Sequence, residues 1–147
     1  MPHIQTIVRA IILSHHNVLL VRDRIEGHVY PPGGHIEYGE SAHDAIVREA
    51  SEEFGGRVTI GAFLGAIEHA FEYRGEKIHE VSLVFAATPL NFTYPKPPVS
   101  RESRLDIFWY PVNALKAIGL LPPMAELIDR HVNGAKPACG FPRFAEA

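Results

Sequence analysis

The chain has 147 residues, a formal charge of −3 and 46% hydrophobic residues, as expected for one soluble globular domain spanning residues 1–147. The slightly negative charge argues against a basic surface for duplex nucleic acid. The single cysteine, Cys139, excludes an internal disulfide, and the longest apolar run, Val81–Ala87, is too short to span a membrane. We therefore expect a cytoplasmic protein with a free thiol.

The first half of the chain predicts a hairpin, an irregular segment and one helix. Segments rich in Ile and Val at Ile4–Leu13 and Val18–Arg22 predict two paired strands. The Pro-Pro-Gly-Gly run at 31–34 is expected to interrupt regular structure. Ser41 offers an N-cap for a helix over Ala42–Phe54, which two following glycines would end.

The second half of the chain predicts a longer hairpin, a loop and two short helices. Arg57–His69 and Ile78–Ala87 are β-branched or apolar runs, and the polar segment between them would turn at Gly75. The four prolines of Pro89–Arg104 indicate a loop. The remaining predictions are a strand at Asp106–Tyr110, short helices at Val112–Ile118 and Met124–Val132, and an irregular tail from Asn133. Together these elements favour an α+β fold, a mixed sheet with helices on both faces.

Three glutamates share one face of the predicted helix. At about 100° per residue, Glu49, Glu52 and Glu53 fall on one side of a helical wheel. Each like-charge pair at these spacings destabilises a helix by about 0.2–0.5 kcal/mol, so a compensating cation is expected. Carboxylate oxygens suit Mg²⁺ or Mn²⁺. The residues expected to face the core instead are Ile46, Val47, Ala50 and Phe54. Taken alone, three such glutamates also fit a solvated acidic surface.

The residues around the glutamates follow the spacing G-x5-E-x7-R-E-x2-E-E-x-G. Its fixed positions are Gly34, Glu40, Arg48, Glu49, Glu52, Glu53 and Gly55. At average residue frequencies, a chance match has odds of about one in a million. At these residues the sequence resembles the Nudix hydrolase family, whose signature contains all seven. Ala50 and Gly56 depart from it, since the signature has bulky aliphatic residues at both positions.

The resemblance implies an α/β/α sandwich and a hydrolase that uses Mg²⁺ or Mn²⁺. Such enzymes break the pyrophosphate bond of a nucleoside diphosphate linked to another group. By the same resemblance, Glu49, Glu52 and Glu53 are the catalytic and metal-binding carboxylates, and the Gly33 carbonyl is a further ligand. Which glutamate acts as the general base stays open.

Other motif residues are expected to position these groups. The resemblance implies that Arg48 orients a catalytic glutamate and that Glu40 pairs with Arg48. Family members often add an acidic residue from a later loop, for which Glu102 is the first candidate and Glu80 the second, although either also fits an ordinary surface charge. The residues expected to shape the loop and helix are Gly34, Glu40 and Gly55.

The substrate within this class stays open. The family's ADP-ribose marker is a proline about fifteen residues past the motif, and the segment from Arg57 to Ala87 contains none. Tyr73 matches the marker for dinucleoside polyphosphates, and oxidised nucleoside triphosphates fit equally well. The second hairpin instead resembles that of members acting on nucleotide sugars and ADP-ribose. Tyr30, Phe71 and Tyr73 could stack on a base, although aromatic residues in a hairpin also fit ordinary packing.

Two further hypotheses concern the kind of protein and its assembly. A catalytically silent Nudix-like module that binds nucleotides is the alternative to an enzyme, but such a module would be expected to lack a motif glutamate, and none is missing. A homodimer is possible, with the apolar runs Ile4–Leu13 and Val81–Ala87 as its interface.

Overall fold

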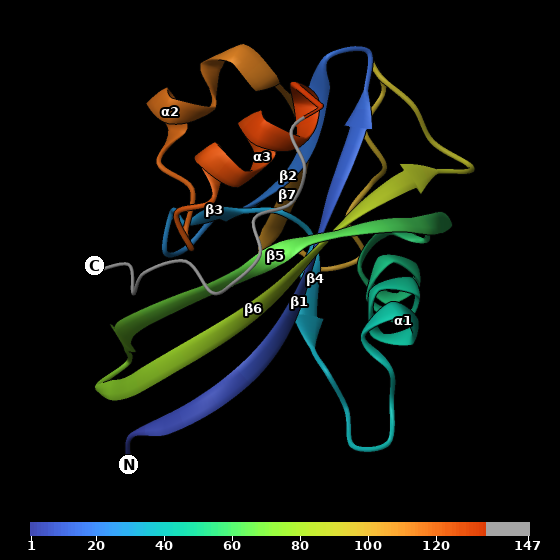
Figure 1. Cartoon of the computed structure of the whole chain (residues 1–147). Coiled ribbons are helices and arrows are strands. Elements are labelled where there is room, and N and C mark those ends of the chain that lie inside the picture. Colours follow the sequence, from blue (N-terminus) through green and yellow to red (C-terminus); the bar gives the residue numbers. More distant parts are fainter. Residues whose placement is uncertain (135–147) are drawn as a thin grey trace.

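A computed structural model describes residues 1–134, in which seven strands form one curled, mixed sheet (Figure 1). The strands are β1 (His3–Ser14), β2 (Asn17–Asp23), β3 (Val29–Tyr30), β4 (Gly33–His35), β5 (Val58–Tyr73), β6 (Glu76–Pro89) and β7 (Leu105–Pro111). The main strand order is β3-β2-β1-β6-β5, with β4 paired to β1 and β7 paired to β2. The strand β1 therefore lies in the middle of the sheet, where it pairs with β2, β4 and β6.

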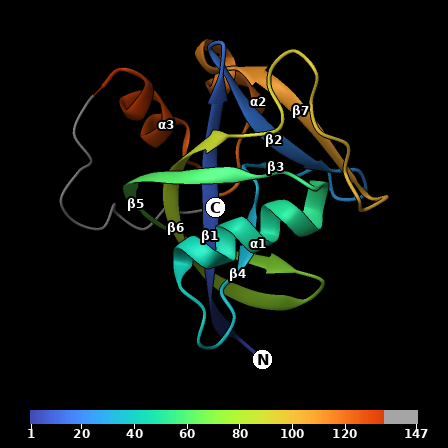
Figure 2. The same cartoon turned by 90° about the vertical axis from the view of Figure 1, so that its right-hand side faces the viewer.

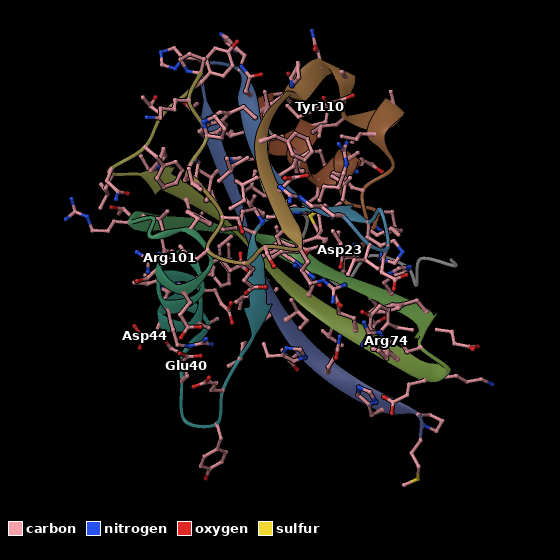
Figure 3. All side chains as sticks on the ribbon, turned by 180° about the vertical axis from the view of Figure 1, so that it is seen from behind. Asp23, Glu40, Asp44, Arg74, Arg101 and Tyr110 are labelled. Carbon is pink, nitrogen blue, oxygen red and sulfur yellow. The ribbon has the colours of Figure 1, made fainter. Side chains whose placement is uncertain are left out.

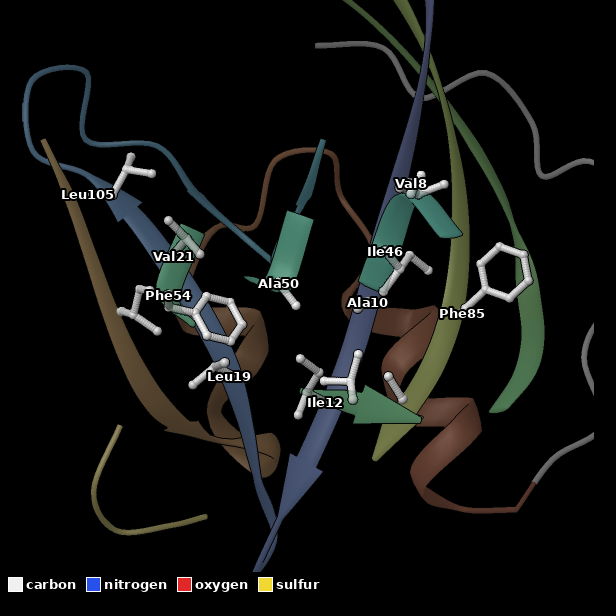
Figure 4. Packing of buried hydrophobic residues seen from close by; sticks show 14 residues of the cluster. Val8, Ala10, Ile12, Leu19, Val21, Ile46, Ala50, Phe54, Phe85 and Leu105 are labelled. Carbon is white, nitrogen blue, oxygen red and sulfur yellow. The ribbon is translucent and has the colours of Figure 1, made fainter. Parts of the chain in front are cut away.

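The helices cover both faces of this sheet, as the sequence predicts. They are α1 (Ala42–Phe54), the 3₁₀ helix η1 (Val112–Ala114), α2 (Leu115–Ile118) and α3 (Ala125–Val132). Figures 1 and 2 show α1 on one side of β1, β5 and β6, with α2 and α3 on the other. Each side has its own apolar core, and Figure 4 shows the one beneath α1.

The alternation of side chains along β1 assigns its residues to these two cores. Val8, Ala10 and Ile12 join the core beneath α1, whereas Ile11 joins the core beneath α2 and α3. Because side chains alternate along a strand, Arg9 lies on the same face as Ile11. This places a charged residue within an otherwise apolar part of the strand.

Pro31 and Pro32 interrupt regular structure between β3 and β4 as predicted, but the glycine pair at 33–34 forms a short strand, so the prediction is wrong for these two residues. The strand β4 pairs antiparallel with Ile7–Arg9 of β1. A Cβ atom added at Gly33 would overlap the backbone carbonyl of Val8, so this close pairing requires glycine. The sequence motif is consequently anchored to the central strand of the sheet.

The long hairpin is confirmed, with a tighter turn than predicted. The strands β5 and β6 meet at Arg74 and Gly75, both with positive φ, which is typical of a two-residue hairpin turn. The two apolar runs suggested as a dimer interface pair with each other as β1 and β6, and much of each is buried within the chain. They therefore do not form a free surface.

The C-terminal helices differ slightly from the prediction. The segment at 112–118 is divided into η1 and α2, and Met124 precedes α3 rather than opening it. Cys139 and most of the predicted irregular tail lie outside the described residues. Within residues 1–134, no helix is long and apolar enough to cross a membrane.

Candidate active site

The helix α1 begins and ends as its sequence predicts. The Ser41 side chain accepts a hydrogen bond from the backbone N–H of Asp44 at 3.0 Å, which caps the N-terminus. At the C-terminus, Gly55 has φ +63°, and the backbone N–H groups of Gly55 and Gly56 donate to Ser51 and Ala50. This Schellman-type end fixes the length of the helix and the positions of its glutamates.

The face of α1 that meets the sheet is wider than the helical wheel indicates. Ile46, Ala50 and Phe54 are buried as predicted, but Val47 is 46% exposed and lies outside the core. Glu53 is only 8% exposed, so the expectation that it contributes little to the core is wrong. By contrast, the Glu52 side chain is 61% exposed. The three glutamates therefore span the boundary between core and solvent.

Arg48 connects the loop before α1 to the glutamates. Its Nε and Nη2 atoms donate to the two carboxylate oxygens of Glu40 at 2.7 and 2.9 Å, and Nη2 also donates to the His35 carbonyl. Its Nη1 atom donates to Glu49 at 3.0 Å and to Glu52 at 3.2 Å. The guanidinium lowers the pKa of Glu40, so that carboxylate remains charged. The bidentate pairing fixes the guanidinium plane and with it the orientation of Glu49.

The Glu49 carboxylate lies against the backbone of β4. A Cβ atom added at Gly34 would clash with this carboxylate, so the motif glycine provides the space that Glu49 occupies. Burial raises the pKa of Glu49, while the hydrogen bond and charge of Arg48 oppose the rise. The Glu49 carboxylate is thus held between the backbone of Gly34 and the guanidinium of Arg48.

Glu53 is the most strongly perturbed carboxylate at this site. Burial raises its pKa to about 8, the charge of Glu49 acts in the same direction, and Arg9 opposes it. Its Oε2 atom is buried and has no hydrogen-bond partner within the described residues. A buried acceptor without a partner is costly, so this oxygen is suited to a cation or a proton.

The loop before β7 brings a further acid toward Glu53. The backbone N–H of Arg101 donates to the Glu53 carbonyl at 2.7 Å, and the Arg101 side chain donates to the Ser51 carbonyl at 3.1 Å. Figure 3 shows Arg101 beside α1. The adjacent residue Glu102 is exposed, and its charge contributes to the raised pKa of Glu53. Glu102 therefore lies close enough to Glu53 to act on it.

Comparison with known proteins identifies the family. The model of the NUDIX domain matches residues 3–131, which is most of the chain. This chain belongs to the Nudix family. It is a Nudix hydrolase by that membership, and the seven matching signature residues are those that form the loop and helix described above.

The chain resembles Nudix proteins both in sequence and in structure. It is 25% identical over 134 residues to an uncharacterized Nudix hydrolase, YvcI, of Bacillus subtilis strain 168, covering 91% of this chain and 83% of that protein. A NUDIX hydrolase from Nitrosomonas europaea superimposes with a TM-score of 0.70 at 20% identity, covering 96% of this chain and 94% of the other. An ADP-ribose pyrophosphatase from Streptococcus suis 89-1591 has a TM-score of 0.64 at 17% identity, covering 94% and 96%. The structural similarities show a shared fold.

The departure from the Nudix signature at Gly56 has a packing explanation. Phe54 and Phe92 form an edge-to-face pair with ring centroids 5.5 Å apart. A Cβ atom added at Gly56 would clash with the Phe54 ring and approach the Phe92 ring closely. In this Nudix chain the aromatic pair thus occupies space near the helix end that a bulky aliphatic residue would need.

The acidic residues of this Nudix site fit a divalent cation, although they do not form a complete ligand set in this conformation. Among residues 1–134, no three His, Cys, Asp or Glu side chains are arranged to hold a metal ion. Arg48 engages one oxygen each of Glu49 and Glu52. The unpartnered Oε2 atom of Glu53 gives this acidic cluster a buried oxygen that is suited to a cation, and burial raises the pKa of the same carboxyl. Hard oxygen donors suit Mg²⁺ or Mn²⁺.

One charged residue near the site, Glu80, is misplaced by the sequence analysis, and another, Arg9, is not singled out by it. Glu80, considered as a surface charge, is 4% exposed and lies on the sheet face opposite α1. Arg9 was not singled out, yet it pairs with Glu80 and influences the pKa of Glu53. The signal in the sequence is a charged residue at an inward position of an apolar strand, which requires a buried partner.

Proposed function

We propose that this Nudix hydrolase is a divalent-cation-dependent pyrophosphohydrolase that acts on a nucleoside diphosphate linked to another group. The observation that carries the proposal is Glu53, a buried carboxylate with an unpartnered oxygen beside two further glutamates. Such a cluster needs a compensating positive charge. The carboxylates of Glu49, Glu52 and Glu53 and the Gly33 carbonyl would hold Mg²⁺ or Mn²⁺.

The proposed chemistry is attack of water on phosphorus. A bound divalent cation would neutralise phosphate charge and lower the pKa of the attacking water. One of the three glutamates accepts the proton of that water, and Arg48 keeps the Glu49 carboxylate in a fixed orientation through its bonds to Glu40. Glu102, held near Glu53 by the docked loop, adds a further negative group at this end of the site.

The substrate belongs to a small set of phosphoric anhydrides. The structural relatives include an ADP-ribose pyrophosphatase and a UDP-X diphosphatase, and a putative mutator protein of Mycobacterium tuberculosis is 43% identical over 49 residues, a fifth of its length. Nucleotide sugars, ADP-ribose, dinucleoside polyphosphates and oxidised deoxynucleoside triphosphates are therefore the compounds to screen with Mg²⁺.

The test combines this screen with one glutamate variant. Because the Glu52 side chain is largely exposed, Glu52→Gln should fold normally. Its turnover should fall by roughly 10²–10⁴-fold, the scale of general acid–base contributions. Glu126→Gln, on the exposed surface of α3, is a matched control that should retain full turnover. Nucleotide binding without hydrolysis of any compound in the screen would instead support the silent binding module.

A further inference from the structure

The helix α1 carries two glutamates at the end where its own dipole disfavours them. Glu52 and Glu53 lie in the last turn, and that turn contains no basic residue. Because the C-terminal end of a helix carries partial negative charge and unpaired carbonyls, a cation is expected there. Arg101, in the loop before β7, supplies this cation from a distant part of the chain (Figure 3).

Arg101 caps this helix end with both its side chain and its backbone. Its Nη1 atom donates to the Ser51 carbonyl at 3.1 Å, and its backbone N–H donates to the Glu53 carbonyl at 2.7 Å. A Cβ atom added at Gly55 would lie 2.7 Å from Nη2 of Arg101, so the guanidinium packs closely against this glycine. Gly55 therefore ends α1 and also leaves room for an arginine from another segment.

The loop of residues 100–104 turns tightly around Arg101. Ser100 Oγ accepts a hydrogen bond from the backbone N–H of Glu102 at 3.0 Å and donates to the Glu102 carbonyl at 2.9 Å. The same carbonyl accepts from the backbone N–H of Leu105 at 3.1 Å. The backbone of Glu102 is thus fixed relative to Arg101, so the docking of Arg101 on α1 determines where the Glu102 side chain begins.

The other end of this loop is attached to β2 and the residues that follow it. The Arg104 guanidinium pairs with Asp23, and the Arg104 carbonyl accepts from the backbone N–H of Arg24 at 2.8 Å. The Arg24 side chain donates to the Ser103 carbonyl at 3.1 Å. Within the described chain, the hydrogen bonds between this loop and α1 are all made by Arg101. Its contacts therefore decide how closely the loop approaches the glutamates.

Glu102 depends on this docking for its place beside the acidic site. Its side chain is exposed and makes no hydrogen bond to any of residues 1–134, so its location follows from how its backbone is held. The charge of Glu102 acts on the carboxyl of Glu53 and on the hydroxyl of Tyr30. The carboxylate of Glu102 thus lies on the side of the loop that faces the buried glutamate.

We propose that Arg101 is a positioning residue, which caps α1 and thereby holds the Glu102 carboxylate beside Glu53, where it adds to the acidic groups that bind the divalent cation. This inference rests on the proposed function. It adds that an arginine outside the signature keeps an acid from a separate loop in reach of the metal site.

The sign of the effect on metal affinity separates positioning from simple electrostatics. Arg101 is a cation near a cation site, so by Coulomb's law alone its removal should strengthen Mn²⁺ binding. If Arg101 acts by holding Glu102, its removal should instead weaken Mn²⁺ binding, because one carboxylate is no longer held in place. Arg101→Ala keeps the backbone bond to Glu53, so we expect a loss of roughly three- to tenfold, the scale of one hydrogen bond.

The test is calorimetric titration of the whole chain with Mn²⁺, without substrate, as a double-mutant cycle. Arg101→Ala and Glu102→Gln should each weaken Mn²⁺ binding. The double variant should bind no more weakly than Glu102→Gln alone, since Arg101 then has no carboxylate to position. Arg101→Lys, which keeps a donor and the charge, should recover part of the affinity.

A second variant and a control complete the experiment. Ser100→Ala removes the side-chain bonds that fix Glu102 without changing any charge, so it should also weaken Mn²⁺ binding, and it serves if Arg101→Ala does not fold. Arg130→Ala removes an exposed arginine that pairs with Glu126 on α3. This matched control should bind Mn²⁺ as the wild type does.

The inference is overturned if Arg101→Ala binds Mn²⁺ as tightly as the wild type or more tightly, if Glu102→Gln leaves the affinity unchanged, or if the effect of Arg101→Ala persists in full beside Glu102→Gln. Absence of Mn²⁺ binding by the wild type at millimolar concentration overturns it as well. Failure of the proposed function alone would look different. In that case the cycle behaves as expected, but no phosphoric anhydride in the screen is hydrolysed with Mg²⁺ or Mn²⁺.

Discussion

The buried carboxylate of Glu53 makes the metal-free protein sensitive to pH. In the folded chain the pKa of Glu53 is about 8, against an ordinary value of 4.5. Between these values the folded state retains a proton that the unfolded state has released. The free energy of unfolding is therefore highest, as far as Glu53 is concerned, below pH 4.5. It decreases as the pH rises from 4.5 toward 8, because the unfolded state then releases a proton that the folded state retains. Replacing Glu53 with Gln, which is always neutral, should remove this dependence.

The size of the effect follows from the pKa difference. Each pH unit inside the window changes the free energy of unfolding by about 1.4 kcal/mol, so raising the pH from 5 to 7 costs the wild type about 3 kcal/mol. That is a large part of the 5–15 kcal/mol typical of a whole domain, and it corresponds to a shift in Tm of roughly 6–12 °C. Other groups titrate as well, so the quantity to measure is the difference between Glu53→Gln and wild type.

The assay is thermal unfolding in a chelator at several pH values between 5 and 8. Near pH 5 the two proteins should melt close together, and at pH 7 the Gln variant should melt higher. Glu52→Gln is the matched control, because that side chain is largely exposed and should show little pH-dependent difference. Adding Mg²⁺ at neutral pH should stabilise wild type more than Glu53→Gln. Parallel curves for wild type and Glu53→Gln across the whole range would refute the reasoning.

Further predictions concern the motif and the metal. Gly34→Ala adds a methyl group against the Glu49 carboxylate and should lower kcat in a steady-state assay, with a stability loss of about 1–3 kcal/mol at most. Arg48→Lys cannot reproduce the two parallel bonds to Glu40, so kcat/KM should fall at least roughly tenfold; equal kcat/KM would contradict this. Gly56→Val should destabilise the fold by about 1–3 kcal/mol in urea unfolding, because it displaces the neighbouring aromatic pair. Saturating Mg²⁺, at 100 times its Kd, should raise the free energy of unfolding by about 2.7 kcal/mol, measured by denaturant titration.

Much of the fold near the motif could be predicted from local sequence. The cap at Ser41, the end of α1 at Gly55 and the long hairpin with its turn at Gly75 all depend on residues close together in the chain. Local signals of this kind act through backbone conformation and short-range hydrogen bonds. They do not depend on distant segments, so the structure agrees with them.

The burial of Glu53 could not be predicted in the same way. A helical wheel assigns a residue to a face, but which faces are covered depends on distant segments. Arg101 lies 48 residues after Glu53 in the chain, and its backbone N–H donates to the Glu53 carbonyl. This bond docks the loop containing Arg101 on α1. Val47, an apolar residue on the same helix, is left exposed because no segment covers it in the described structure.

The pairing of Arg9 with Glu80 illustrates the same limit. Arg9 and Glu80 are 71 positions apart and meet only because β1 and β6 pair in parallel with a particular register. Periodicity gives no strand order, so the sequence can indicate that a charged residue at an inward position needs a partner but cannot identify that partner.

The most direct test of the account is hydrolysis in ¹⁸O-labelled water with Mg²⁺, using the best substrate from the screen and mass spectrometry of the products. If water attacks phosphorus, one phosphate-containing product should carry one ¹⁸O atom, and the sugar and base should carry none. Glu52→Gln and Glu53→Gln should both slow appearance of the labelled product. Label on an anomeric carbon, or equal rates in wild type and both variants, would contradict the assignment of this acidic face as the catalytic site of a pyrophosphohydrolase.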